Sequence, residues 1–435
     1  MSKTGMEAAI IARGAQWGRR PRLRTGGPPV HRPQAGRPSH EGVYFSMVAD
    51  PDPIKSVDAI LLEARSRQKQ IVALIREMVE CESPSDDPAA VNRFVDLLAD
   101  VAPSFARVKT LPGGRFGRHL VCEFDLFGKK KQGQILALGH SDTVWPLGTL
   151  ASMPFRQKDG RLWGPGVLDM KAGIAFFLYA MRILRDLETP VARKVVMQIN
   201  SDEEVGSESS RALTERNARR SQAVLVLEPG TGLEGKLKTA RKGIGDYTVT
   251  VRGKAAHSGL DFAGGASAVL ELARQIGKIA AFTDLRRGIT VNPGVISGGT
   301  RVNVVPAEAR AEVDMRIPRL KDAAALDRKF RALRPVDKRC AIEIAGGLNR
   351  PPLERSPAVV QLFRKARSLA GELGVTLDES SVGGGSDGNF TAALGIPTLD
   401  GLGAVGEGAH ALHESILVDR IADRTALLAK LVAAL

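Results

Sequence analysis

Strand-like apolar runs alternate with helix-like segments along most of the chain, and this order constrains the fold more than any other feature. Before residue 240, strands are expected at 119–124, 134–138, 194–199 and 223–227. The helices expected around them are 56–80, 88–99, 171–187 and 208–219. The same pattern returns later, with helices at 357–373, 389–394 and 420–435 and a strand at 397–402. The sequence therefore predicts an α/β domain with a central mixed sheet flanked by helices.

The pattern changes near residue 240. Residues 245–258, GDYTVTVRGKAAHS, alternate like a half-exposed strand. The elements expected after it are a helix at 266–281, strands at 289–296 and 309–316, a helix at 322–333 and a strand at 339–345. This β-α-β-β-α-β order predicts a ferredoxin-like α+β domain of residues 241–350. It is inserted into a larger domain of residues 47–240 and 351–435.

The net charge of +14 is spread along the chain in a way that argues against nucleic-acid binding. Residues 1–46 supply +6 of it, and the other 389 residues carry +8 without a dense basic run. A mildly basic surface favours small anionic substrates. Retention on heparin after removal of residues 1–46 would revive the nucleic-acid hypothesis.

Residues 1–46 are rich in Arg, Pro and Gly, which predicts a disordered leader, and we expect translation to start at Met47. No apolar run reaches the ~18 residues of a membrane span, so no membrane partner is expected. Cys81, Cys122 and Cys340 lie far apart, which predicts buried free thiols. A cytoplasmic location follows, with the periplasm as the alternative.

Side chains that bind metals follow several of the predicted strands. His140 and Asp142 follow one strand, Glu203 and Glu204 follow another, and Glu228 ends a third. Because the carboxyl ends of strands in an open α/β sheet meet at one edge, these residues are expected to converge. Further candidates come from two other segments, Asp169 in a Gly-rich loop and the pair His410 and His413.

Two imidazoles with three or four carboxylates suit zinc, and a shared carboxylate would give two metals ~3.5–4 Å apart. Cations would also offset the repulsion among the neighbouring Asp202, Glu203 and Glu204. Taken singly each motif is weak, since a lone His after a strand is usually packed or exposed and a Glu-Glu pair is usually a solvated loop. Together they predict a metal site.

The chain resembles the zinc-dependent aminoacylase and carboxypeptidase family in six ordered motifs, GHSDTV, GPGVLDMKAG, DEEVGS, LEPG, RGKAAHSG and HALHE. Within this family it looks most like the bacterial glutamate carboxypeptidases. The resemblance covers residues 55–435. It implies two zinc ions, with cobalt or manganese as substitutes. In the roles that it implies, His140 binds one zinc ion, His410 binds the other, and Asp169 bridges both. Glu204 and Glu228 each bind one of the two ions.

The resemblance also implies the remaining roles in the catalytic domain. Glu203 would be the general base and later the acid, and Asp142 would orient His140. His413 is the alternative to His410, which is preferred because Glu414 follows it by four residues, as in the family.

By the same resemblance the inserted domain is a dimerisation domain and the protein a homodimer. His257 would reach a neighbouring active site and stabilise the oxyanion; otherwise it is a surface-turn histidine. Asn303, Arg316 and Arg350 match positions that hold the substrate carbonyl and carboxylate, although Arg316 could be a structural charge. Gly385 lies in GGGSDGNF, which lacks the Lys-Ser/Thr of a phosphate loop and is expected to line the carboxylate side.

The resulting expectation is a hydrolase that cleaves the amide bond of an N-acyl amino acid or short peptide with a free carboxylate, releasing glutamate. The alternative is a deacylase of the aminoacylase or acetylornithine deacetylase kind. An alternative of another class is a catalytically silent binding protein with the same fold. The intact set of metal and base residues argues against the silent protein, and a panel of substrates with and without chelator discriminates among all three.

Overall fold

The computed structural model describes residues 58–435, and the leader, Met47 and the first two residues of the expected helix 56–80 lie outside this range. A six-stranded sheet has the order β1-β2-β6-β3-β7-β16. Its strands are β1 Ala106–Pro112, β2 Arg118–Phe124, β6 Lys194–Asn200, β3 Gln134–His140, β7 Ser221–Val226 and β16 Thr398–Leu399. β3 is parallel to β6 and β7, whereas β2 is antiparallel to β6. The predicted central mixed sheet is confirmed.

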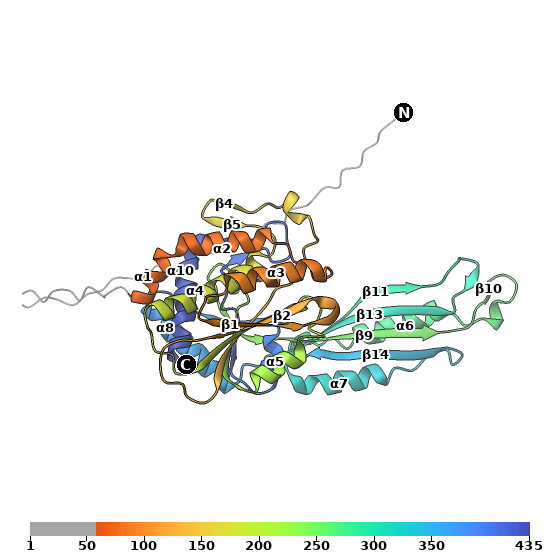
Figure 1. Cartoon of the computed structure of the whole chain (residues 1–435). Helices are drawn as coiled ribbons and strands as arrows, with labels where there is room; N and C mark the ends of the chain where they lie inside the picture. Colours follow the sequence, from red (N-terminus) through yellow and green to blue (C-terminus); the bar gives the residue numbers. More distant parts are fainter. Residues whose placement is uncertain (1–57) are drawn as a thin grey trace, which may run out of the picture. The chain divides into compact units, whose positions relative to one another are not determined.

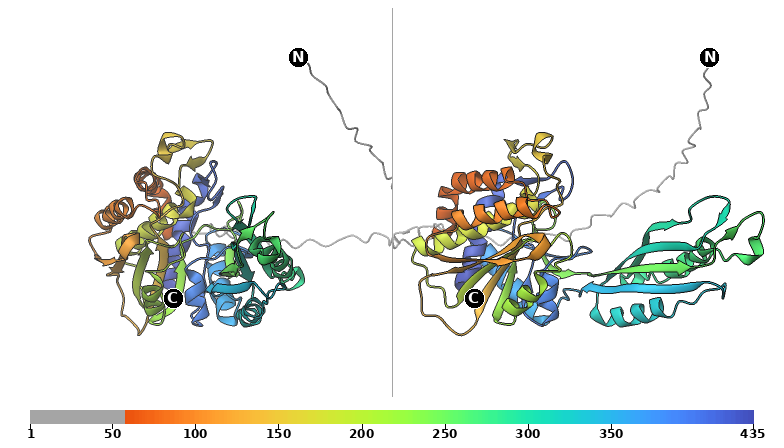
Figure 2. Two further views of the ribbon diagram at one scale, coloured as in Figure 1. Left: turned by 90° about the vertical axis from the view of Figure 1, so that its right-hand side faces the viewer. Right: turned by 45° about the vertical axis from the view of Figure 1, so that its right-hand side comes forward.

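Helices flank this sheet (Figures 1 and 2). They are α1 Ala59–Ser66, α2 Gln68–Glu80, α3 Pro88–Val101, α4 Ala172–Asp186, α5 Arg211–Ala218, α8 Pro357–Glu372, α9 Gly388–Ala393 and α10 Ile421–Ala434. Alternate residues of β3 enter different cores. Ile135 and Ala137 pack in the core that holds α4 and α10, while Leu136 and Leu138 pack in the core that holds the end of α5. Burial on both faces explains why this strand is apolar throughout.

The expectation of one helix over 56–80 is wrong, because the chain breaks between α1 and α2. Arg67 has φ −92° and ψ 0°, and its guanidinium pairs with Glu63 and Asp186. The break lets α1 pack on α10 while α2 packs on α4. The 3.6-residue period of the sequence continues across the break, so periodicity could not reveal it.

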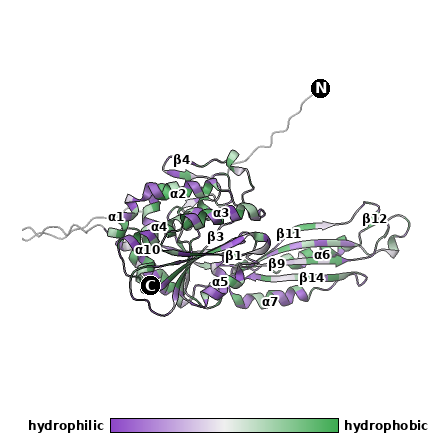
Figure 3. Ribbon diagram, in the orientation of Figure 1, coloured by the Kyte–Doolittle hydropathy of each residue, from purple (hydrophilic) through white to green (hydrophobic). Residues whose placement is uncertain are grey.

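The inserted domain is a four-stranded antiparallel sheet of order β11-β13-β9-β14 with helices α6 and α7. Its elements are β9 Gly243–Arg252, α6 Ala268–Ala280, β11 Thr290–Gly298, β13 Glu308–Ile317, α7 Leu320–Arg331 and β14 Ala341–Arg350. Both helices carry apolar and polar residues in alternation (Figure 3). Tyr247 of β9 stacks on Phe330 of α7 with ring centroids 3.8 Å apart. This is the expected ferredoxin-like arrangement.

Several short strands were not expected from the sequence. They are β4 Arg156–Lys158, β5 Arg161–Trp163, β8 Leu237–Arg241, β12 Val304–Val305, β15 Glu379–Val382, β17 Gly406–Glu407 and β18 Ser415–Leu417. The strand expected over 245–258 is interrupted after β9, and its last part forms the separate short strand β10 Ala256–His257. β10 pairs with β12, and both lie at the end of the inserted domain that is distant from the six-stranded sheet (Figures 1 and 3). We call this end the tip.

Within residues 58–435, no helix combines the length and the apolar character needed to cross a bilayer. The three cysteines are free, as expected. Cys122 and Cys340 are buried, but Cys81 is partly exposed.

Candidate metal centre

The predicted metal-binding residues of three strands meet at one edge of the larger sheet. His140 is the last residue of β3, Glu203 and Glu204 follow β6, and Glu228 follows β7. These strands are mutually parallel, so their carboxyl ends lie together. Asp169 joins them from the turn Val167–Lys171 that leads into α4, in which Asp169 itself has the non-helical backbone angles φ −115° and ψ 93°.

Asp169 stands between two histidines. His140 Nε2 lies 3.3 Å from Asp169 Oδ1, whereas His410 Nε2 lies 3.4 Å from Asp169 Oδ2. His140 Nε2 is also 3.6 Å from Glu228 Oε1, and His410 Nε2 is 3.3 Å from Glu204 Oε1. The cluster therefore has two halves, each with an imidazole, a glutamate and one oxygen of Asp169.

The donor atoms are close enough to share metal ions. One ligand atom each of His140, Asp169 and Glu204 lie within 4.8 Å of one another, and the same holds for His140, Glu203 and Glu228. Oε1 of Glu204 is buried, and apart from its contact with His410 Nε2 it has no hydrogen-bond partner among residues 58–435; a cation would supply one. Imidazole nitrogen with carboxylate oxygen is a donor set for divalent metals such as zinc. The residues fit a divalent metal ion.

Asp142 organises the site by two routes. His140 Nδ1 lies 2.9 Å from the backbone carbonyl of Asp142, which leaves Nε2 free to bind a metal. The Asp142 carboxylate accepts the backbone N–H groups of Glu203, at 3.2 Å, and Glu204, at 3.1 Å. The sequence indicated the first role but not the second, in which Asp142 fixes the backbone of the two glutamates.

Two cations that sequence reasoning missed lie behind Glu228. Arg241 Nη2 is 3.2 Å from Glu228 Oε2, and Lys238 Nζ is 3.9 Å from the same oxygen. Arg241 also donates from Nε and Nη2 to the buried Asp400, each at 2.8 Å. The available signal was the basic run KLKTARKG, residues 236–243, five residues after the LEPG segment.

Arg350 lies against Glu203. Its Nη2 is 3.1 Å from Glu203 Oε1 and donates to the Glu203 carbonyl and to Ser207 Oγ at 2.7 and 2.6 Å. Asp387 is a further partner at 3.4 Å. Here Arg350 neutralises the proposed base, a contact that the sequence did not indicate.

Gly385 and Arg316 are both near Ile244, the β9 residue that pairs with Arg350. A Cβ on Gly385 would be 2.7 Å from Ile244 Cδ1 and 3.2 Å from Arg350 Cδ, so a larger residue there would require these side chains to shift. Arg316 pairs with Ile244 from the other side, on β13. Its Nε donates to Asp314 at 2.6 Å, and its side chain is 33% exposed.

Three predicted or alternative residues lie apart from the cluster. His257 and Asn303 are at the tip, where Nδ1 of His257 accepts the N–H groups of Gly259 and Leu260 at 3.1 Å. This leaves His257 Nε2 as an exposed donor. His413 packs over Gly408, while His410 adopts a φ of +62° and joins the cluster.

Glu414, which the sequence offered only as a marker for His410, is completely buried. Its carboxylate accepts the backbone N–H groups of Gly166, Leu168 and Asp169 at 2.9, 2.8 and 3.1 Å. The indole of Trp145 donates to it at 2.8 Å. Glu414 thus ties together the segments that carry His140, Asp169 and His410.

The close packing of these groups shifts their protonation. The carboxylates of Asp169 and Glu204, which accept from Nε2 of the protonated ring, raise the pKa of His410 to about 10. Burial opposes charging of His140, but Asp142, Asp169 and Glu228 still raise its pKa well above the usual value. Burial raises the pKa of Glu203 and of Glu204. Without metal, the cluster therefore holds protons that cations would displace.

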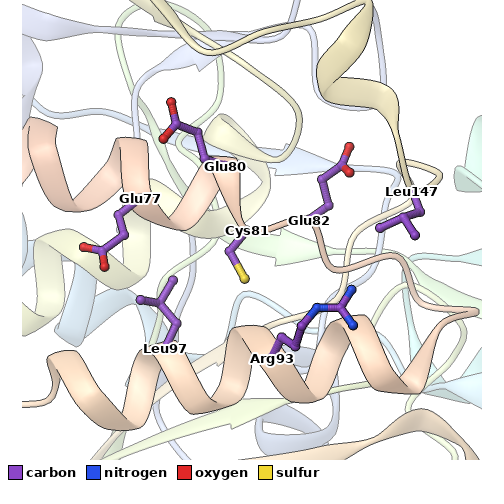
Figure 4. Close-up of a pocket in the computed structure, with 7 residues that line it drawn as sticks. All are labelled: Glu77, Glu80, Cys81, Glu82, Arg93, Leu97 and Leu147. Atoms are coloured by element: carbon purple, nitrogen blue, oxygen red, sulfur yellow. The ribbon is translucent and has the colours of Figure 1, made fainter.

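The surface also has a pocket that lies apart from the metal cluster. A pocket of about 490 Å³ is lined by Glu77, Glu80, Glu82, Cys81 and Arg93, with two leucines (Figure 4). It contains none of the clustered residues, so the chemistry of the side chains, and not volume, identifies the centre.

Residues 136–434 match the model of Peptidase family M20/M25/M40. The chain is 28% identical over 361 residues to carboxypeptidase G2 of Pseudomonas sp. (strain RS-16), covering 81% of this chain and 86% of that protein. It is 30% identical over 378 residues to succinyl-diaminopimelate desuccinylase of Cereibacter sphaeroides (strain KD131 / KCTC 12085), covering 80% and 94%.

Among solved structures, the fold resembles that of the Bacillus subtilis YXEP protein, a dinuclear metal binding peptidase from the M20 family. The TM-score is 0.62 at 13% identity, over 85% of this chain and 98% of that one. The family match spans more than half of the sequence, from β3 to the last helix. The chain is therefore a hydrolase that belongs to peptidase family M20/M25/M40.

Proposed function

We propose that the protein is a dinuclear zinc hydrolase that cleaves an amide bond next to a free α-carboxylate and releases glutamate from an N-acylglutamate or a short peptide. The observation that carries this proposal is the placement of Asp169 between His140 and His410, with Glu203 buried beside them. The likeness to carboxypeptidase G2 supports the carboxypeptidase type of reaction.

In this proposal, His140, Asp169 and Glu228 hold one ion, and His410, Asp169 and Glu204 hold the other. Bound zinc would acidify a water molecule and polarise the amide carbonyl. Glu203 accepts the proton of the attacking water and passes it to the leaving nitrogen. Its burial raises its pKa, which suits a group that must first take a proton and then give it up.

The free carboxylate of the substrate is assigned to the arginines near Ile244. Arg316 is partly exposed, and its one side-chain partner among residues 58–435 is Asp314, so it is available to a ligand. Arg350 would exchange its contact with Glu203 for the substrate. This exchange frees the base when a carboxylate is bound, and Gly385 leaves the space for the Arg350 side chain.

A homodimer would complete the site. The edge strand β11 exposes Val295 and Ile296, which are 57% and 59% exposed, and the neighbouring α6 exposes Leu270. Pairing with a second copy would cover these side chains. His257, with its free Nε2 donor at the tip, would then serve the second copy's site by stabilising the oxyanion. The proposed compartment is the cytoplasm.

A deacylase of N-acyl amino acids is the second candidate function. The desuccinylase likeness favours it, because that relative is as extensively aligned as carboxypeptidase G2. Both activities use the same metal centre and differ only in the groups accepted on either side of the amide.

Amino-acid release by the zinc-loaded protein tests the proposal. The panel is folate, N-acyl amino acids and dipeptides that end in Glu, Asp or Ala, each with and without chelator. Chelator-sensitive release confined to C-terminal Glu is expected. Release regardless of the amino acid would favour the deacylase, and no release with two zinc ions bound would leave the silent binding protein.

A further inference from the structure

The loops that carry the metal-binding residues expose apolar side chains. Val144 follows Asp142 by two residues, Val205 is next to Glu204, and Leu412 follows His410 by two residues. They are 42%, 49% and 75% exposed, respectively. Residues two apart have Cα atoms within ~7 Å, so all three stand close to the cluster. We call Val144, Val205 and Leu412 the apolar rim.

The same loops lack positive charge. Residues 140–150, 201–210 and 403–415 contain no Lys or Arg, although they contain the exposed acidic residues Glu208 and Glu407. Lys171, at the end of the Asp169 turn, is buried and donates to the carbonyl of Cys81 at 2.9 Å. A second negative group on the substrate would therefore find no free cation on these loops.

The cations next to the cluster are already paired with protein carboxylates. Arg241 binds Asp400 and Glu228, and Lys238 lies 3.9 Å from each of these two residues. Arg316 and Arg350 are assigned to the α-carboxylate of the amino acid that leaves. A further carboxylate on the substrate would gain no ion pair here and would displace water from itself and from the apolar rim, whereas an apolar group would gain burial against the rim.

We infer that the acyl side of the substrate is uncharged and apolar, and that the apolar rim binds it. This inference rests on the proposed function and specifies its acyl group. It selects aliphatic or aromatic N-acyl amino acids over those with a dicarboxylic acyl group, such as succinyl. It thereby separates this chain from the desuccinylases, to which it is similar in sequence.

If a second copy places its His257 at this site, the residues of its tip would also lie near the acyl group of the substrate. Leu260 and Phe262, which follow His257, are 85% and 67% exposed. Arg301 is the one cation among residues 257–265 and 299–305, and it is exposed. Arg339 contacts the first of these segments from outside, donating to the carbonyls of Ala263 and Gly265. Because Arg301 is the cation within the two segments, its replacement by Ala is a necessary arm of the test.

The experiment compares N-butanoyl-, N-hexanoyl- and N-succinylglutamate on the zinc-loaded protein, by kcat/KM and by calorimetric binding. Butanoyl and succinyl groups have the same number of carbons and differ by one carboxylate. We expect butanoylglutamate to exceed succinylglutamate by at least tenfold in both measurements, and hexanoyl to exceed butanoyl. A butanoyl-to-succinyl ratio below about threefold, or the absence of binding by all three compounds, overturns the inference.

Substitutions test whether the apolar rim causes the preference for an uncharged acyl group. Leu412→Lys, and Val144→Lys in case the first does not fold, should raise the succinyl-to-butanoyl ratio at least fivefold by adding a cation to the rim. Leu62→Lys is the matched control, since Leu62 is 51% exposed on α1, and it should leave the ratio unchanged. Arg301→Ala should also leave it unchanged. An effect of Leu62→Lys equal to that of both rim variants would overturn the assignment to the rim.

Failure of the proposed function gives a different result. Tight binding of the butanoyl compound over the succinyl compound, without release of glutamate from either, would refute glutamate release and retain the acyl preference. Release of glutamate from both compounds at equal rates would retain the proposed function and refute the acyl preference.

Discussion

The buried carboxylate of Glu414 accepts a hydrogen bond from the backbone N–H of Asp169 at 3.1 Å. Asp169 is the residue whose two oxygens face the two halves of the cluster. Glu414 is also four residues from His410 in the sequence. Glu414 thus connects Asp169, which faces both proposed metals, to the segment of His410, which faces one of them.

Replacement of Glu414 by Gln should weaken metal binding. The carboxylate of Glu414 accepts hydrogen bonds from backbone N–H groups, but the NH₂ group of a glutamine can only donate. Because two donors would then face each other, the turn that carries Asp169 should be displaced. Loss of such a supporting contact costs about 10- to 100-fold in metal affinity or activity. Metal stoichiometry by mass spectrometry and a zinc titration measure it. Glu407→Gln, which removes an exposed partner of Arg161, is the control and should bind metal normally. Two zinc ions held by Glu414→Gln with unchanged affinity would contradict this role.

Glu203→Gln should abolish most turnover while two metals stay bound. General-base catalysis contributes roughly a hundredfold to ten-thousandfold, so kcat should fall by that factor. Glu208→Gln, in the same loop but exposed and paired with Arg115, should retain full activity. Loss of one metal from Glu203→Gln would show that Glu203 and Glu204 have exchanged roles.

Zinc binding should release protons at pH 7. The raised pKa values of His410, about 10, and of His140 mean that both imidazoles are protonated at pH 7 without metal. Zinc binds neutral imidazole, so these protons must leave, and the apparent zinc affinity should rise with pH until about pH 10.

Calorimetry in buffers of different ionisation enthalpy counts these protons. His410→Gln should release about one proton fewer and lose one metal. His413→Gln, outside the cluster, should match the unmodified protein. A binding enthalpy that is the same in every buffer would exclude the proposed proton release.

Gly385→Ala should impair substrate binding more than folding. The added Cβ would meet Ile244 and Arg350, and Arg350 must shift because its Cδ would be only 3.2 Å away. Overpacking of this kind costs about 1–3 kcal/mol, and we expect KM to rise several-fold. In Gly383→Ala the new Cβ has no atom within 4 Å, so its KM should not change. Equal KM values for both variants would argue against a substrate role for Arg350.

The sequence predicted the positions that follow long, buried strands and missed their supporting contacts. His140, Glu204 and Glu228 could be found because apolar strands end beside them, and parallel strands place such ends together. The roles of Asp142 and Glu414 as acceptors of backbone N–H groups could not be predicted, because sequence does not show which carboxylate meets which amide. β1 was missed because it is an edge strand with no fully buried residue, so it lacks the continuous apolar run that marked the neighbouring strands.

Anomalous diffraction at the zinc edge, from crystals grown with zinc, tests the central claim of a dinuclear centre most directly. We predict two peaks about 3.5–4 Å apart on either side of the Asp169 carboxylate. One should lie beside His140 and Glu228, and the other beside His410 and Glu204. A single peak, or two peaks that do not share Asp169, would contradict the account.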